Sequence, residues 1–168
     1  MESNGFLIQL DEIPGGEAVF EWKAGKDFFE SFENEEVIDA QLNIKTILRK
    51  AGGYVTVDCK VVGELTLTCD RCAEDLVMPI DVAIALNVKF GQEEEVDDDV
   101  RETIFIPAGE SALDLSQTIY DYVCLSLPLQ RVHPEGGCSQ AALKYLGGEA
   151  DAEVADSSPF ASLKHLLQ

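Results

Sequence analysis

Cysteine and histidine residues in two separate parts of the chain have the types and spacing of a metal-binding site. Cys69 and Cys72 form a Cys-x-x-Cys pair, and His133 and Cys138 follow far downstream in the stretch His-Pro-Glu-Gly-Gly-Cys. A Cys-x-x-Cys knuckle holds two thiolates close enough to bind one soft cation, and a later His and Cys complete the tetrahedral shell of a structural zinc site. The sequence therefore predicts a structural zinc ion at these four residues, which would fasten together distant segments.

Other interpretations of these residues stay open. Cys69 and Cys72 also fit two half-buried thiols at a strand end, or a redox disulfide, although thioredoxin-like chemistry normally has Cys-x-x-Cys beside a βαβ pattern, which is absent. His133 and Cys138 also fit an exposed loop histidine and a small buried cysteine. Arg71, between the first two cysteines, fits a salt-bridge donor or an interaction residue.

Motifs of catalysis are absent from the sequence. It contains no Gly-x-Ser-x-Gly elbow, no Walker loop and no Gly-x-Gly-x-x-Gly after an expected strand. A shell of three cysteines and one histidine would also leave no coordination position open for a substrate. We therefore expect a protein that is not an enzyme, with no catalytic residues and no organic cofactor.

Length and composition favour one globular domain. The chain has 168 residues, 46% of them apolar, and no apolar run long enough to cross a bilayer. Its first residues lack the basic and apolar regions of a signal peptide, so a cytoplasmic location is expected. Five cysteines, an odd number, favour metal binding or free thiols over a disulfide framework. Cys59 and Cys124 lie on apolar faces and are expected in the core.

The charge of the chain is strongly acidic. Thirty-two acidic residues and twelve basic ones give a formal net charge of −20, and Arg49-Lys50 is the only adjacent basic pair. Because affinity for nucleic acid comes largely from clustered Lys and Arg at phosphates, weak or no binding to naked RNA is expected. An acidic surface instead suits a basic protein partner, or simply keeps the chain soluble.

Residues 37 to 90 alternate between apolar and polar side chains with a period of two. The pattern runs through three segments, from Leu42 to Leu48, from Val55 to Cys69 and from Ile80 to Phe90. Such alternation is typical of strands with one buried face, and short turns between them favour an antiparallel meander. Gly63 inside the second segment indicates a bend or bulge. The predicted fold is α+β, mostly an antiparallel β meander or a partly closed barrel, with C-terminal helices.

Helices are expected mainly in the C-terminal half. The clearest covers about 114–126, with Asp114 as N-cap, Gln117 completing a capping-box-like pattern, and Pro128 ending it. An acidic loop is expected at 91–99, a short helix at 141–146 and an amphipathic helix at 159–167. The expected organisation is an N-terminal part (1–36), a β-rich core with the knuckle and helix (37–146), and an acidic linker with a C-terminal helix (147–168).

A family resemblance follows from the order of these features. A β-rich stretch ending in Cys-x-Arg-Cys precedes an acidic loop, the Asp114-Leu115 helix start, the Leu127-Pro128 exit, the His133 and Cys138 segment, and Pro-Phe-Ala-x-Leu from Pro159. Over roughly residues 40–168 this resembles the YceD family, which is associated with accumulation of large-subunit ribosomal RNA in bacteria and plastids. The family often has Cys/Cys as its downstream pair, and this chain resembles the His/Cys version.

The resemblance implies a factor in large ribosomal subunit biogenesis. From the charge we expect an acidic protein adaptor that holds a basic ribosomal protein or a pre-ribosomal particle. One alternative is a metal- or thiol-dependent enzyme acting on RNA or a small molecule, which needs an open metal shell or a low-pKa thiolate. The other is a direct RNA-binding module, which needs a basic patch assembled from Lys45, Arg49, Lys50, Lys60 and Arg71.

Overall fold

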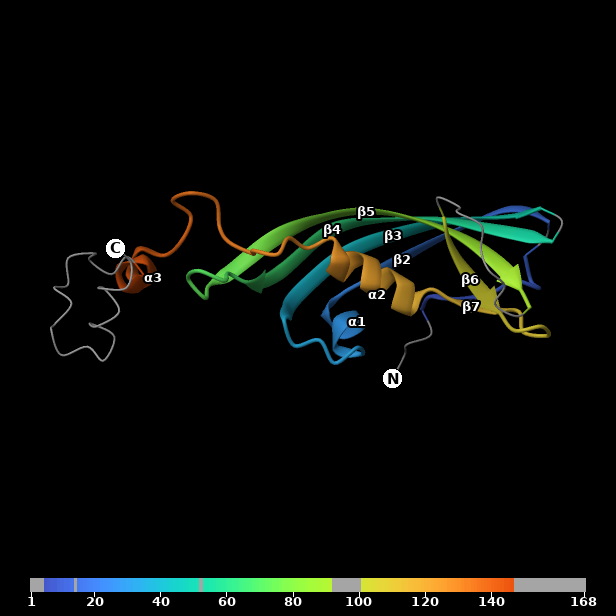
Figure 1. Ribbon diagram of the computed structural model, residues 1–168, viewed down its shortest axis with the longest axis horizontal. Coiled ribbons are helices and arrows are strands. Elements are labelled where there is room, and N and C mark those ends of the chain that lie inside the picture. The colour runs from blue at the N-terminus through green and yellow to red at the C-terminus, as the bar shows by residue number, and fades with distance from the viewer. Residues whose placement is uncertain (1–4, 14, 52, 92–100, 147–168) are drawn as a thin grey trace, which may run out of the picture.

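A long, curved, mostly antiparallel sheet forms the body of the molecule (Figure 1). The structure is a computed structural model that describes residues 5–13, 15–51, 53–91 and 101–146. The main sheet has the strand order β2-β3-β4-β5-β6, and a second, two-stranded sheet pairs β1 with β7. The strands are β1 (Leu7–Gln9), β2 (Gly16–Ala24), β3 (Val37–Ala51), β4 (Tyr54–Thr68), β5 (Asp75–Phe90), β6 (Glu102–Ile106) and β7 (Ala112–Asp114). The helices are α1 (Lys26–Glu30), α2 (Ser116–Leu125) and α3 (Gln140–Leu146).

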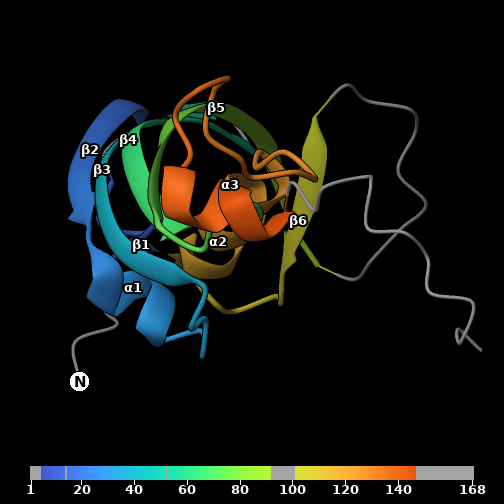
Figure 2. The same cartoon turned by 90° about the vertical axis from the view of Figure 1, so that its left-hand side faces the viewer.

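The predicted α+β fold with mostly antiparallel strands is confirmed. Strands β2 to β5 form a meander in which each strand pairs antiparallel with the next one along the chain. The partly closed barrel is wrong, because the sheet is open: β2 lies at one edge and β6, paired parallel to β5, lies at the other. Figure 2 shows the sheet curving around α2.

The hydrophobic core lies on the concave face of the sheet. Along β4 the alternate residues Val55, Val57, Cys59 and Val61 are buried, which is the alternation that the sequence predicts. Leu115, Ile119 and Val123, at the start of and within α2, are buried against the same core. Among the described residues no helix has the length and apolar character needed to cross a membrane.

The start of α2 differs from the prediction. Asp114 is not the N-cap, because it ends β7 and pairs with Leu7, so the helix begins at Ser116 with Leu115 in the capping position. The Asp114 carboxylate still accepts hydrogen bonds from the backbone N–H and the hydroxyl of Ser116, at 2.8 and 2.6 Å. Gln117 does not close a capping box; its amide donates to Asp121 at 2.8 Å. Strand pairing thus overrides the local capping signal.

Two other predicted segments lie outside the described residues, namely nearly all of the acidic loop at 91–99 and the helix at 159–167. The short helix expected at 141–146 is present as α3.

Gly63 is required by close contact between strands. No register shift falls at Gly63 in its pairing with Leu42 or Ile80, so the predicted bulge is wrong. A Cβ atom at this position would lie 2.0 Å from the backbone oxygen of Gln41 and 2.9 Å from the Cα of Leu42. The backbone of β3 therefore comes too near for any side chain.

We expect Gly63→Ala to destabilise the protein by about 2 kcal/mol or more, because the backbones of β3 and β4 must separate to admit a methyl group. The matched control is Gly53→Ala, where an added Cβ meets no atom within 4 Å. Urea unfolding of both variants measures the two free energies. Equal stability of the two variants would contradict the close contact at Gly63.

Candidate metal centre

The Cys-x-x-Cys knuckle is the hairpin turn between β4 and β5. Cys69 directly follows β4, and its backbone N–H donates to the Glu74 carbonyl at 2.8 Å. The N–H of Ala73 donates back to the Cys69 carbonyl at 2.9 Å, and Ala73 has the left-handed φ of 58°. These two bonds curl the backbone so that Cys69 and Cys72 are both buried under the turn.

A second segment reaches the knuckle from the end of α2. The N–H of Asp70 donates to the Arg131 carbonyl at 2.8 Å, and the N–H of Arg131 donates to the Asp70 carboxylate at 2.7 Å. Beyond His133, a turn closed by the N–H of Gly137 on the Pro134 carbonyl, at 2.8 Å, returns the chain toward the knuckle. The two Asp70–Arg131 hydrogen bonds and this turn together position His133 and Cys138 next to the knuckle.

The structure brings all four predicted metal ligands together. The ligand atoms of Cys69, Cys72, His133 and Cys138 lie within 4.8 Å of one another. Cys69 Sγ is 4.0 Å from Cys138 Sγ, and His133 Nδ1 is 3.4 and 3.9 Å from the sulfur atoms of Cys72 and Cys138. In a tetrahedral site with bonds of about 2.3 Å, neighbouring ligand atoms lie about 3.8 Å apart. The cluster therefore has the dimensions of a tetrahedral metal site.

The orientation of the His133 ring fits metal binding. Its Nε2 lies 3.0 Å from the backbone oxygen of Asp75, and a carbonyl can only accept, so Nε2 carries the proton. In the neutral ring Nδ1 then presents its lone pair to the sulfur atoms. A metal-bound histidine commonly donates its second N–H to a carbonyl in this way, which fixes the ring and its tautomer.

The centre forms a small apolar cluster separate from the main core. Cys69, Cys72 and Cys138 are 1%, 8% and 5% exposed, and they pack with Leu76. Partly buried residues from the downstream segment and from β5 complete this cluster, namely Met78, Val132, Ala142 and Leu143. The described residues after α2 thus contact the sheet hairpin through this second cluster.

Local hydrogen bonds favour a thiolate at Cys69. Burial alone would raise its pKa, but backbone N–H groups of Cys72, Arg71 and His133 lower the pKa from 9.0 to about 6. Burial, followed by the sulfur atoms of Cys72 and Cys69, raises the pKa of Cys138. A deprotonated thiol among backbone donors is the form that binds a metal ion.

The pKa of His133 is raised, whereas that of Cys69 is lowered. Burial would lower the pKa of His133, but the Asp75 carbonyl and the sulfur atoms of Cys69 and Cys72 outweigh it and raise the pKa. These contacts therefore favour the protonated form of His133 more than water does for a free histidine.

The remaining residues considered from sequence have different environments. Cys59 is buried in the main core and Cys124 packs partly buried against it, as predicted. Arg71 is exposed and forms no ion pair with a described residue, so its expected salt bridge is not found. The partners Asp70 and Arg131 were missed, although they stand one residue after Cys69 and two before His133. The only sequence signal that could have identified Asp70 and Arg131 is their nearness to the predicted ligands, because neither belongs to a periodic pattern.

Comparison with known families identifies the part of the chain that contains the candidate centre. The model of the family described as "Large ribosomal RNA subunit accumulation protein YceD" matches residues 57–167, a range that includes all four residues of the centre. Neither the curated proteins nor the solved structures gave a match to the chain.

We expect metal-free protein to show a thiolate that titrates near pH 6, assigned to Cys69 by its loss in Cys69→Ser. Thiolate absorbance at 240 nm measures it. Because the folded pKa of about 6 lies below the ordinary 9.0, ionisation of Cys69 contributes stability that is complete above pH 9 and is lost as the pH falls through 6. A wild-type titration with no step below pH 8 would contradict this environment.

Proposed function

The chain belongs to the YceD family, and from this premise we propose that it is a non-enzymatic factor in large ribosomal subunit biogenesis. The family is described by its role in accumulation of the large ribosomal RNA subunit. In our proposal the chain contributes to it as an acidic protein adaptor. Its partner would be a basic ribosomal protein or a pre-ribosomal particle, whose positive charge it shields until assembly.

The four-residue cluster carries the structural part of this proposal. Three sulfur atoms and one imidazole nitrogen, all within 4.8 Å of one another, are a ligand set that zinc prefers. All four positions would be filled by the protein, so the ion would stabilise structure and would leave no position for a substrate. It would fasten the segment after α2 to the β4–β5 hairpin.

The sheet surface supports a protein partner rather than naked RNA. The basic residues of the RNA-binding alternative are largely paired: Lys45 with Glu21 at 3.1 Å, and Arg49 with Glu17 and Asp58 at 2.9 and 2.6 Å. Lys60 pairs with Asp81, and the Lys50 ammonium donates to the Leu10 carbonyl. Phosphates would have to displace these carboxylates, which lowers the gain from binding RNA.

One observation favours the thiol-enzyme alternative. The lowered pKa of Cys69 is a property of reactive cysteines. However, Cys69 is 1% exposed and its sulfur lies among the other ligand atoms, so a substrate could not reach it without opening the cluster. The metal-ligand role accounts for both the low pKa and the burial.

We expect protein purified without chelators to contain one zinc ion per chain, and chelation to lower its melting temperature by at least roughly 5 °C, because the ligands lose the ion that joins them. Cys69→Ser should lose the zinc. Cys124→Ser, a half-buried cysteine outside the cluster, is the matched control and should retain it. Elemental analysis and thermal unfolding give the two readouts. Zinc-free protein that is insensitive to chelator would contradict the proposal.

We also expect the chain to co-purify with particles of the large subunit while binding protein-free ribosomal RNA weakly at physiological salt. Affinity purification from growing cells with sequencing and mass spectrometry tests the first part. A gel-shift series at low and physiological salt tests the second, because binding driven by phosphates weakens steeply as salt rises. Tight, sequence-selective binding of naked RNA at physiological salt would instead favour the RNA-binding alternative.

A further inference from the structure

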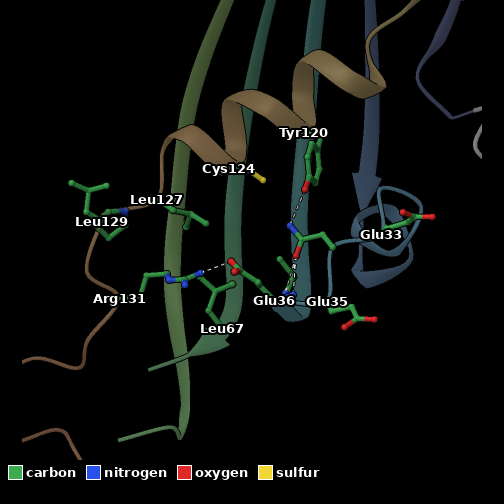
Figure 3. A pocket seen from close by; sticks show the side chains of 12 residues that line it. Glu33, Glu35, Glu36, Leu67, Tyr120, Cys124, Leu127, Leu129 and Arg131 are labelled. Carbon is green, nitrogen blue, oxygen red and sulfur yellow. Dashed lines mark hydrogen bonds and ion pairs between the residues drawn. The ribbon is translucent and has the colours of Figure 1, made fainter. Parts of the chain in front are cut away.

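A groove of about 510 Å³ is lined in part by the segment that leads to the candidate metal centre. Figure 3 shows the side chains that line it. Three parts of the chain form its walls: the turn at 33–36 between α1 and β3, the C-terminal end of α2, and the segment 127–131 that leads to the centre. None of its lining residues is a ligand of the candidate metal centre. The groove is therefore a separate feature that the centre does not explain.

Hydrogen bonds and an ion pair hold the walls of the groove in place. The Asn34 amide donates to the Tyr120 hydroxyl at 2.9 Å, and its oxygen accepts from the N–H groups of Glu36 and Val37 at 2.9 and 3.3 Å. Across the groove, the Arg131 guanidinium donates to the Glu36 carboxylate at 2.8 Å (Figure 3). The groove is thus formed before any partner arrives, which lowers the entropic cost of binding.

The rim of the groove attracts positive charge. Glu33 and Glu35 are exposed, and neither forms an ion pair with a described residue. Arg131 is the one basic residue among the described lining residues, and Glu36 and Asp70 already neutralise it. The last turn of α2 contains no basic residue, so the negative end of its dipole adds to the same potential.

Apolar side chains lie across the groove from these carboxylates (Figure 3). Leu127 is half-buried and points into the groove, whereas Leu129 is fully exposed at the opposite wall from Glu33 (Figure 3). Leucines on one wall and glutamates without a described ion-pair partner on the other match a segment that carries both apolar and basic side chains.

We propose that this groove docks a basic segment of a protein partner, with Lys or Arg side chains at Glu33 and Glu35 and an apolar side chain between Leu127 and Leu129. The inference rests on the proposed function, for which it supplies the contact surface. The carboxylates would repel RNA phosphates, and a second copy of the chain would bring a further net charge of −20. A cationic peptide is the occupant that satisfies both the charge and the leucines.

The test uses the full chain and a short fluorescent peptide of lysines and arginines around two leucines, with binding measured by anisotropy. The double variant Glu33→Gln/Glu35→Gln should bind the peptide roughly fivefold more weakly, mainly through a slower on-rate. The matched control is Glu12→Gln/Glu110→Gln, which removes the same charge from exposed residues away from the groove. The control should bind within a factor of about two of wild type.

The apolar part is tested with Leu129→Ser against Tyr54→Ser, since both side chains are largely exposed and only Leu129 lines the groove. Leu129→Ser should weaken binding, and so should replacing the peptide leucines by serine. Equal weakening by both charge variants would overturn the groove and leave only net charge. The full chain would fail to bind the peptide if a second copy or residues 147–168 occupied the groove. That result would also overturn the proposed docking of a basic partner segment.

A parallel measurement separates this inference from the proposed function. Particles of the large subunit captured equally by wild type and by Glu33→Gln/Glu35→Gln would overturn the groove as the contact surface while the proposed function stands. Absence of such particles from the wild-type purification would refute the proposed function itself, whatever the peptide result.

Discussion

The position of the chain after α2 depends on the meeting of the β4–β5 hairpin with the segment from Arg131 to Cys138. The described residues of this segment pack around Cys69, Cys72 and Cys138 in a cluster of their own, apart from the main core on the concave face of the sheet. Four potential ligand atoms within 4.8 Å occupy the centre of that cluster. An ion at this point would join two parts of the chain that few other buried contacts hold together.

The contact between the β4–β5 hairpin and the segment after α2 also shapes the groove. Arg131 contacts the knuckle through Asp70 and the turn after α1 through Glu36, at 3.6 and 2.8 Å between charged atoms. The segment that lines the groove is therefore positioned by the residues that carry the centre. In our proposal, a structural ion would stabilise one wall of the groove and the exposed glutamates would provide its charge.

Sequence alone predicted the features that depend on periodicity and on ligand type. Alternating residues fixed the buried face of β4, and the cysteine spacing indicated both the knuckle and its downstream partners. Prediction from the sequence failed where contacts between residues distant in the sequence determine the structure. Asp114 has the character of an N-cap, yet pairing with Leu7 keeps it in a strand. Gly63 suggested a bulge, whereas the neighbouring backbone of Gln41 is the cause.

The groove could not have been predicted for the same reason. Asn34 and Tyr120 are far apart in the sequence, and neither belongs to a recognisable motif, so only the packing of α2 against the sheet brings them together. The open sheet likewise depends on which strands lie at its edges. The parallel pairing of β6 with β5 is a contact between separate strands, and no local sequence pattern indicates it.

X-ray absorption at the zinc edge, on protein purified without added metal or chelator, tests the central claim most directly. We expect the spectrum to show three sulfur ligands at about 2.3 Å and one nitrogen ligand at about 2.0 Å, with no oxygen ligand from water. Replacing His133 by Ala should remove the nitrogen from that shell. A shell of oxygen and nitrogen ligands without sulfur, or the absence of bound zinc, would contradict the account.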